Sequence, residues 1–300
     1  MTSRKKWARR AAFLFVIGLA LALAAFAGAG FSFRNLSGQE MIETVFEPEG
    51  EFENISLIAH SSDVKFAPSE DGKTKIVCRT PEKTKYYAKI SDNTLLIDSV
   101  DTREWFDKLR INWGDMMITV YLPQSAYQNL FVHVTTGNVV IPAGLAFENA
   151  RIDAATSFVS LHAAVYEKAS LKTTTGDIDV KGLNAKELSV RLTTGDANLS
   201  DVTAKDVYVK TTTGKIRLTN VKASDKLVGE CTTGGIRLNA CDAGEIDMKA
   251  TTGDIIGTLL TEKTFEAKAA TGTVRVPYSK QGGLCSLETT TGDIDIAIEG

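Results

Sequence analysis

A short turn recurs every 19 or 20 residues through the C-terminal two-thirds of this chain, and it limits the possible folds more than any other feature. Threonine precedes every copy of the turn, and glycine follows in all but one. A unit this short cannot fold alone, so it must stack on copies of itself, which predicts a solenoid. The turn positions are Gly137, Ser157, Gly176, Gly195, Gly214, Gly234, Gly253, Gly272 and Gly292.

Alignment of the copies on the turn shows apolar residues at alternate positions on both sides of it. Two residues after the turn every copy is apolar, as at Ile178, Ile216 and Ile236. The same alternation occurs upstream, as at Leu188 and Val190, and a third side contributes one more inward position. Period-2 alternation is typical of strands with one buried face. Each rung therefore has two short strands that meet at the threonine–glycine corner. The third-side inward positions are Leu183, Val202, Val221, Cys241 and Leu260.

The predicted fold is all-β: a single-stranded, parallel β-solenoid with about ten rungs. The crossover rule favours right-handed coiling. The tenth rung lies upstream, with Ser62 as its turn residue and residues 55–66 around it. The chain then leaves the solenoid for an insert of short strands, which we expect to cap the first rung. The expected organisation is residues 55–126 for the first rung and cap, and residues 127–300 for the repetitive solenoid.

The N-terminus carries a membrane signal. Residues 11–33 contain no charge, which is long enough for a helix to cross a bilayer. The preceding tail, residues 1–10, holds five cationic residues, and this bias places the N-terminus in the cytoplasm. A cleaved signal peptide is the alternative, although its apolar core is usually shorter. The interpretation is a single-pass membrane protein, with an acidic linker at residues 34–54 and the solenoid outside the cell.

The few candidates for chemistry each have a structural alternative. Net charge of −3 argues against nucleic-acid binding. Cys231, Cys241 and Cys285 fall on inward positions, so small buried thiols are favoured over a Cys231–Cys241 disulfide. The three histidines fall in different columns and predict no triad or zinc site. No cofactor and no enzyme activity are therefore predicted. A polysaccharide-active enzyme would need paired carboxylates beside a groove.

Aspartate follows the turn glycine in four rungs, at Asp177, Asp196, Asp254 and Asp293. Stacked carboxylates could hold calcium between rungs. Turn chemistry explains aspartate at this position equally well, because its side chain bonds nearby main chain. The column is interrupted, for example by Lys215 and Gly235.

Three features are candidates for contact with a partner. The first is an outward basic stripe four residues before the turn, at Lys172, Arg191 and Lys210, which could meet anionic polymer or lipid or could be a solvated face. The second is the aromatic segment with Trp105, Phe106 and Trp113, which could anchor a partner or pack the cap. The third is the last rung, with Ile296, where the repeat ends without a cap. A last rung without a cap could self-associate, could dock a partner strand, or could simply fray.

The rungs LKTTTGDIDV, RLTTGDANL and LETTTGDIDI resemble the bacterial putative-adhesin family of unknown function. The segment Arg103-Glu104-Trp105-Phe106, leading into residues 118–123, is similar to membrane-anchored members from Gram-positive bacteria. The resemblance covers residues 41–300 and implies a cell-surface β-solenoid with a link to envelope stress. It brings no catalytic residues. We therefore expect a non-enzymatic surface protein that binds or scaffolds, or alternatively a sensor subunit that acts through its membrane anchor.

Overall fold

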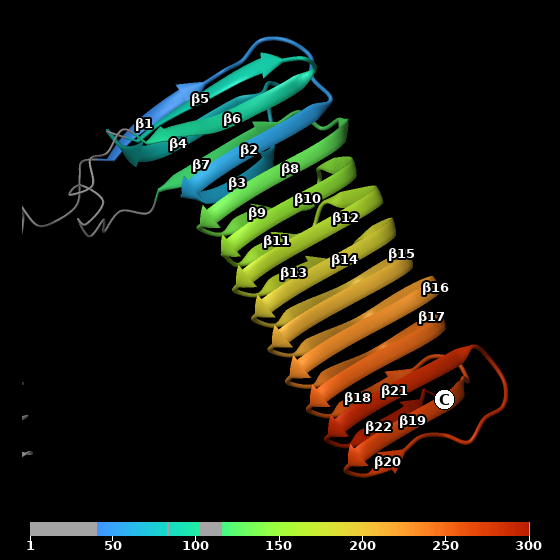
Figure 1. Ribbon diagram of the computed structural model, residues 1–300. Coiled ribbons are helices and arrows are strands. Elements are labelled where there is room, and N and C mark those ends of the chain that lie inside the picture. The colour runs from blue at the N-terminus through green and yellow to red at the C-terminus, as the bar shows by residue number, and fades with distance from the viewer. Residues whose placement is uncertain (1–40, 83, 102–115, 300) are drawn as a thin grey trace, which may run out of the picture.

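The computed structural model describes residues 41–82, 84–101 and 116–299, and every regular element in them is a strand (Figure 1). The N-terminal strands are β1 (Met41–Phe46), β2 (Asn54–Ser61), β3 (Asp63–Pro68), β4 (Lys75–Pro81), β5 (Thr84–Ser91), β6 (Thr94–Asp101) and β7 (Met117–Leu122). The first rungs of the repeat contain β8 (Ala126–Thr136), β9 (Val139–Ile141), β10 (Ala146–Thr156), β11 (Val159–Leu161), β12 (Ala164–Thr175), β13 (Ile178–Lys181) and β14 (Asn184–Thr194). The later rungs contain β15 (Ala197–Thr213), β16 (Ile216–Thr233), β17 (Ile236–Thr252), β18 (Ile255–Leu259), β19 (Thr264–Thr271), β20 (Val274–Arg275), β21 (Leu284–Thr291) and β22 (Ile294–Ile298).

Equivalent positions of successive rungs pair in parallel, as the alignment on the turn predicts. Ile216 pairs with Ala197 on one side and with Ile236 on the other. The long ladders from β8 to β17 keep this register around the turns, with local shifts elsewhere in β10, β15 and β16, and the chain forms an elongated stack (Figure 1). The predicted parallel β-solenoid is confirmed.

The inward columns form one continuous apolar core. Ile178, Ile216 and Leu188 are fully buried, as is Val202 on the third side. One inward position was predicted wrongly: Leu259, and not Leu260, fills the third side of its rung. Leu259 pairs with Cys241 across a register shift, because two residues separate Leu238 from Cys241 and only Thr258 separates Gly257 from Leu259.

The insert adds strands to the first rung. On one side β6 pairs in parallel with β2, and on the other β7 pairs in parallel with β3. Antiparallel strands then follow outward: β5 on β6, and β4 and β1 beyond β7. Strand β1 corrects the predicted linker, because residues 41–46 pair with β4 and Phe46 packs against the core.

At the far end the order of the rungs departs from the order of the sequence. Strand β21 lies between β17 and β19, and β22 lies between β18 and β20 (Figure 1). The chain therefore builds the outermost rung first, with β19 and β20, and then folds back to fill the space it skipped. The prediction that the last rung in sequence is the open end is wrong.

The winding comprises about eight turns and not the predicted ten. Within the parts of the chain that the structure describes, no helix is long and apolar enough to span a membrane. Residues 11–33 lie outside those parts, and so do residues 102–115.

Candidate functional site

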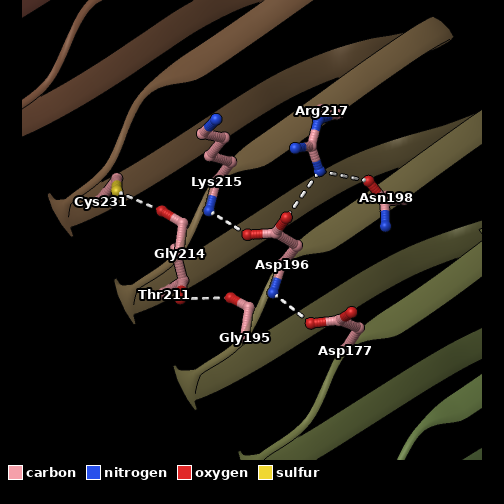
Figure 2. A network of polar contacts seen from close by, with 9 residues as sticks. All are labelled: Asp177, Gly195, Asp196, Asn198, Thr211, Gly214, Lys215, Arg217 and Cys231. Carbon is pink, nitrogen blue, oxygen red and sulfur yellow. Dashed lines mark hydrogen bonds and ion pairs between the residues drawn. The ribbon is translucent and has the colours of Figure 1, made fainter.

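In several rungs the corner is closed on its inner side by a hydroxyl or thiol. Three residues before the turn glycine, Thr211 donates a hydrogen bond from Oγ1 to the Gly195 carbonyl oxygen of the preceding rung, at 3.0 Å (Figure 2). In the next rung Cys231 takes this place, and its Sγ lies 3.2 Å from the Gly214 oxygen. Gly214 has a φ of 145°, and a Cβ there would lie 1.9 Å from the Gly195 oxygen, so only glycine fits.

On the outer side of the corner, aspartates bond the main chain of the next rung. Asp177 Oδ1 accepts a hydrogen bond from the Asp196 amide at 2.7 Å, and Asp196 Oδ1 accepts one from the Lys215 amide at 2.7 Å (Figure 2). Farther along, Asp254 bonds the Asp293 amide. We call this series the aspartate ladder; its members are Asp177, Asp196, Asp254 and Asp293, and Asp293 bonds the Thr273 amide.

The aspartate ladder favours turn chemistry over calcium for these carboxylates, because one oxygen of each is already occupied by an amide. Asp196 Oδ2 also accepts a hydrogen bond from Arg217 at 2.8 Å. Partial burial would raise the pKa of Asp196, but the Lys215 amide and Arg217 outweigh it and hold this pKa below its usual value. Among the described residues, no group of three or more histidine, cysteine, aspartate or glutamate side chains could hold a metal ion.

The basic stripe is shorter than the sequence suggests. Lys172, Arg191 and Lys210 lie on successive rungs with exposed side chains. Lys210 then forms an ion pair with Glu230 at 2.6 Å, which begins an alternation of sign. Lys249 and Lys268 occupy the stripe position on later rungs, but the reversed rung order places Glu288 between them. The uninterrupted positive run is therefore limited to the first three residues.

Of the other predicted contact residues, Ile296 lies in the described part of the chain and the three aromatic residues do not. Ile296 is buried, with 3% of its surface exposed, and its partner in the register is Gly257. It therefore cannot offer an open edge. Trp105, Phe106 and Trp113 lie outside the described residues, so their proposed contacts stay predictions.

All four cysteines are free and buried, as the inward positions of Cys231, Cys241 and Cys285 predict for those three. Burial raises the pKa of the Cys78 and Cys285 thiols to about 12. It raises that of Cys231 to about 11, where the charge of Asp196 adds to the effect. Thiolates, and not thiols, are the reactive species, so these side chains are suited to packing and not to chemistry.

The structure brings together one cluster that the columns do not reveal. His162 Nε2 lies 2.8 Å from Asp179 Oδ2 and 3.3 Å from Ser160 Oγ. A hydrolytic triad needs the serine and the carboxylate on opposite nitrogens of the imidazole. Because both contact the same nitrogen here, the cluster cannot pass a proton from Ser160 to Asp179.

Three solved structures share this fold. One, from Parabacteroides distasonis, is described as a "putative lipid binding protein", with 14% identity and a TM-score of 0.53 over 87% of this chain and 98% of its own. A second from that organism is described as a "putative adhesin", with 13% identity and a TM-score of 0.52 over 87% and 99%. The third, a "putative adhesin" from Parabacteroides merdae, has 13% identity and a TM-score of 0.51 over 87% and 98%.

A search of curated proteins gave no match. The family model described as Toastrack DUF4097 matches residues 52–255 and 203–300, which is the whole solenoid together with most of its cap. Stacked rungs with threonine–glycine corners and a strand-built cap thus place this chain in the Toastrack DUF4097 family.

Proposed function

We propose that this chain is a non-enzymatic, adhesin-like protein of the bacterial cell surface that binds or scaffolds through the long faces of its solenoid. One observation carries the proposal: register-matched rungs repeat the same outward positions along the whole stack. Such a surface offers many weak, equally spaced contacts to an extended ligand. The core, by contrast, is filled by apolar side chains.

The comparisons support a binding role in outline. Two structures of the same fold are described as adhesins and a third as a lipid-binding protein. Both descriptions name binding and neither names a reaction. At 13–14% identity they support the fold directly and the role only by analogy.

The proposed location is the outer face of a single-pass membrane anchor at residues 11–33, as in the Gram-positive members that the sequence resembles. The cationic residues of the N-terminal tail support this orientation. The same anchor supports a second role, in which the protein senses the state of the envelope and passes it to membrane partners.

Fractionation and surface proteolysis of intact bacteria test the location. We expect the full-length protein in the membrane pellet, with the solenoid open to external protease and its N-terminus uncleaved on sequencing. Recovery from the cytosol would contradict the surface role, and a mature start near residue 28 or 30 would replace the anchor with a signal peptide.

A pull-down from native membranes separates the two roles. Recovery of wall polymer or lipid supports binding and scaffolding. Recovery of a stoichiometric membrane protein through residues 11–33 supports the sensor. Recovery of neither, with the solenoid at the surface, would contradict both.

A further inference from the structure

The aspartate ladder is interrupted at two consecutive rungs, where Lys215 and Gly235 occupy the aspartate position. Neither side chain can accept a hydrogen bond. The amides that would donate to them belong to Gly235 and Asp254, one rung farther on. Within the part of the chain that the structure describes, these two amides have no hydrogen-bond acceptor. Two main-chain donors therefore remain open on the outer side of the corner.

Cationic side chains gather at the same place. Lys215 and Arg217 lie on one rung, and Arg237 pairs in register with Arg217 on the next. Arg217 is tied to Asp196, whereas Arg237 has no ion pair among the described residues. The neighbouring rungs carry acids on this face, among them Asp177 and Asp179 before the interruption, and Asp254, Asp293 and Asp295 after it. Between Asp177 and Asp295 the reversal of charge is thus confined to two rungs, and Arg275 on the outermost rung is paired with Asp295.

The open donors and the cations line one cavity of about 320 Å³, which we call the corner pocket; it contains Lys215, Arg217, Gly235, Arg237 and Asp254. Gly235 leaves room because it has no side chain. Asp254 also lines the pocket, and its Oδ1 is occupied, because it accepts the Asp293 amide at 2.8 Å.

We propose that the corner pocket binds a phosphate group. In the intact rungs a carboxylate oxygen satisfies each of these amides, so an external oxyanion would restore the same bond. Two adjacent main-chain N–H groups form a small anion-binding concavity. Arg237 adds a planar pair of donors and Lys215 a mobile charge, a combination that suits a phosphate with several acceptor oxygens.

The phosphate could belong to a lipid headgroup or to a free phosphate ester. The pocket itself does not depend on the proposed surface role. A surface location would only decide which of the two sources is within reach.

The same chain offers an internal control. Phe158 also interrupts the ladder, and it leaves the Asp177 amide without an acceptor among the described residues. No lysine or arginine accompanies that gap; the adjacent outward residues are Ser160 and Asp179. An open amide alone should therefore not bind phosphate, whereas the corner pocket should.

An NMR titration of the full-length protein in detergent with inorganic phosphate tests the proposal. We expect the amide signals of Gly235 and Asp254 to shift and saturate, while that of Asp177 stays still. Lys215→Asp supplies the carboxylate found in the neighbouring rungs, so it should fold normally and weaken binding by at least about tenfold, the equivalent of one charge-assisted hydrogen bond. Lys172→Glu, on the basic stripe, should bind like the wild type.

Unmoved Gly235 and Asp254 signals at high phosphate would overturn the proposal, as would unchanged binding in Lys215→Asp. Equal loss in Lys172→Glu would show diffuse attraction to the basic stripe instead. Vesicles containing phosphatidylglycerol and soluble glycerol phosphate, compared on the same variants, then distinguish the lipid source from the free ester. None of these outcomes depends on where the protein resides.

The outermost rung, formed by β19 and β20, supports a second, independent inference. Within the described residues, β19 pairs only with β21, so its outer edge has no partner strand. Phe265, Ala267 and Val276 of this rung are only partly buried, and Val274 is 39% exposed. The core is therefore open on this side, unlike at the capped end.

The geometry points to a second copy of this chain as the occupant of the β19 edge. If two β19 strands pair antiparallel about a twofold axis through Ala267, Glu266 of each lies opposite Lys268 of the other. The same register places Phe265 opposite Ala269 on the inward face and joins the two cores. Two solenoids would then extend end to end, with their N-termini at opposite ends. If the proposed surface location holds, this pairing would connect proteins on two facing membranes.

A charge swap tests this pairing in the full-length protein, by analytical ultracentrifugation in detergent. We expect a dimer for the wild type and a monomer for Lys268→Glu, in which two like-charged pairs face each other. The double variant E266K/K268E should be a dimer again, and Arg217→Gln, far from the edge, should not change the wild-type behaviour. A monomeric wild type at high concentration, or a dimeric Lys268→Glu, would overturn the pairing and would leave the proposed location unaffected.

Discussion

Two adjacent stretches of the same corner share a backbone and differ in chemistry. At Asp177 and Asp196 a carboxylate closes each corner by accepting the amide of the next rung. At Lys215 and Gly235 the register continues unchanged, but the carboxylates are missing and the charge is reversed. Stacking alone therefore holds the rungs in register. The aspartates add local bonds, and the solenoid can lose them over two rungs and gain a binding surface there.

The largest effect is expected from a substitution in the core beneath both stretches. Ile216 is fully buried between Ala197 and Ile236, so Ile216→Asp would bury a carboxylate without a partner. We expect a loss of several kcal/mol in the free energy of unfolding. Arg217→Gln, one residue along, removes only a half-exposed ion pair and should cost less than about 1 kcal/mol. Similar melting curves for the two variants would refute the assignment of the columns.

Substitutions on the outer side of the corner should change stability less, and in opposite directions in the intact and the interrupted stretch. Asp196→Ala removes the acceptor of the Lys215 amide and of Arg217, and should cost about 1–2 kcal/mol in thermal or urea unfolding. Lys215→Asp should cost nothing or should stabilise, because it gives the Gly235 amide an acceptor. A destabilised Lys215→Asp would mean that the interruption is structural and not an open site.

The pH dependence of the free energy of unfolding tests how much the charge of Asp196 contributes to the intact stretch. The pKa of Asp196 is lower in the folded protein than in the unfolded chain. Its contribution is therefore complete above the unfolded value of 3.8 and is lost as the pH falls through the folded value. Asp196→Asn should reduce stability at neutral pH and converge with the wild type in acid. A constant difference across this range would show that the charge of Asp196 is irrelevant.

The inner side of the corner varies from rung to rung, and thiol chemistry can check its cysteine with little effect on stability. Cys231 replaces the Thr211-type hydroxyl, and the other cysteines fill the core. Labelling in denaturant should count four free thiols, and native labelling should be slow because burial raises their pKa values. A count of two would reveal a disulfide and would contradict the core assignment.

The regular part of this fold could be predicted from the sequence because every inward position repeats. Ile216 and Val190 identify their faces by alternation alone. The reversed order of the last rungs could not be predicted in the same way, since exchanging two copies leaves each column equally apolar. One signal was Ser279, a polar residue at the position where Leu183, Val202, Val221 and Cys241 fill the third side of the regular rungs.

The corner pocket could be predicted only in part. The sequence shows that Lys215 and Gly235 interrupt a column of aspartates. It does not show that each aspartate bonds the amide of the following rung, because this depends on the register between rungs. The significance of the missing carboxylates therefore required the structure. Arg217 and Arg237 were visible as an outward pair, but nothing in the sequence connected them with open amides.

Amide hydrogen exchange of the full-length protein, measured residue by residue by NMR, tests the contrast between the two stretches most directly. The amides of Lys215 and Asp293 should exchange slowly, because aspartates accept them, and those of Gly235 and Asp254 should exchange fast. In Lys215→Asp the Gly235 amide should become slow while the Asp254 amide stays fast. Equal protection of all four amides in the wild type would contradict the account, because the interrupted corner would then be closed like the others.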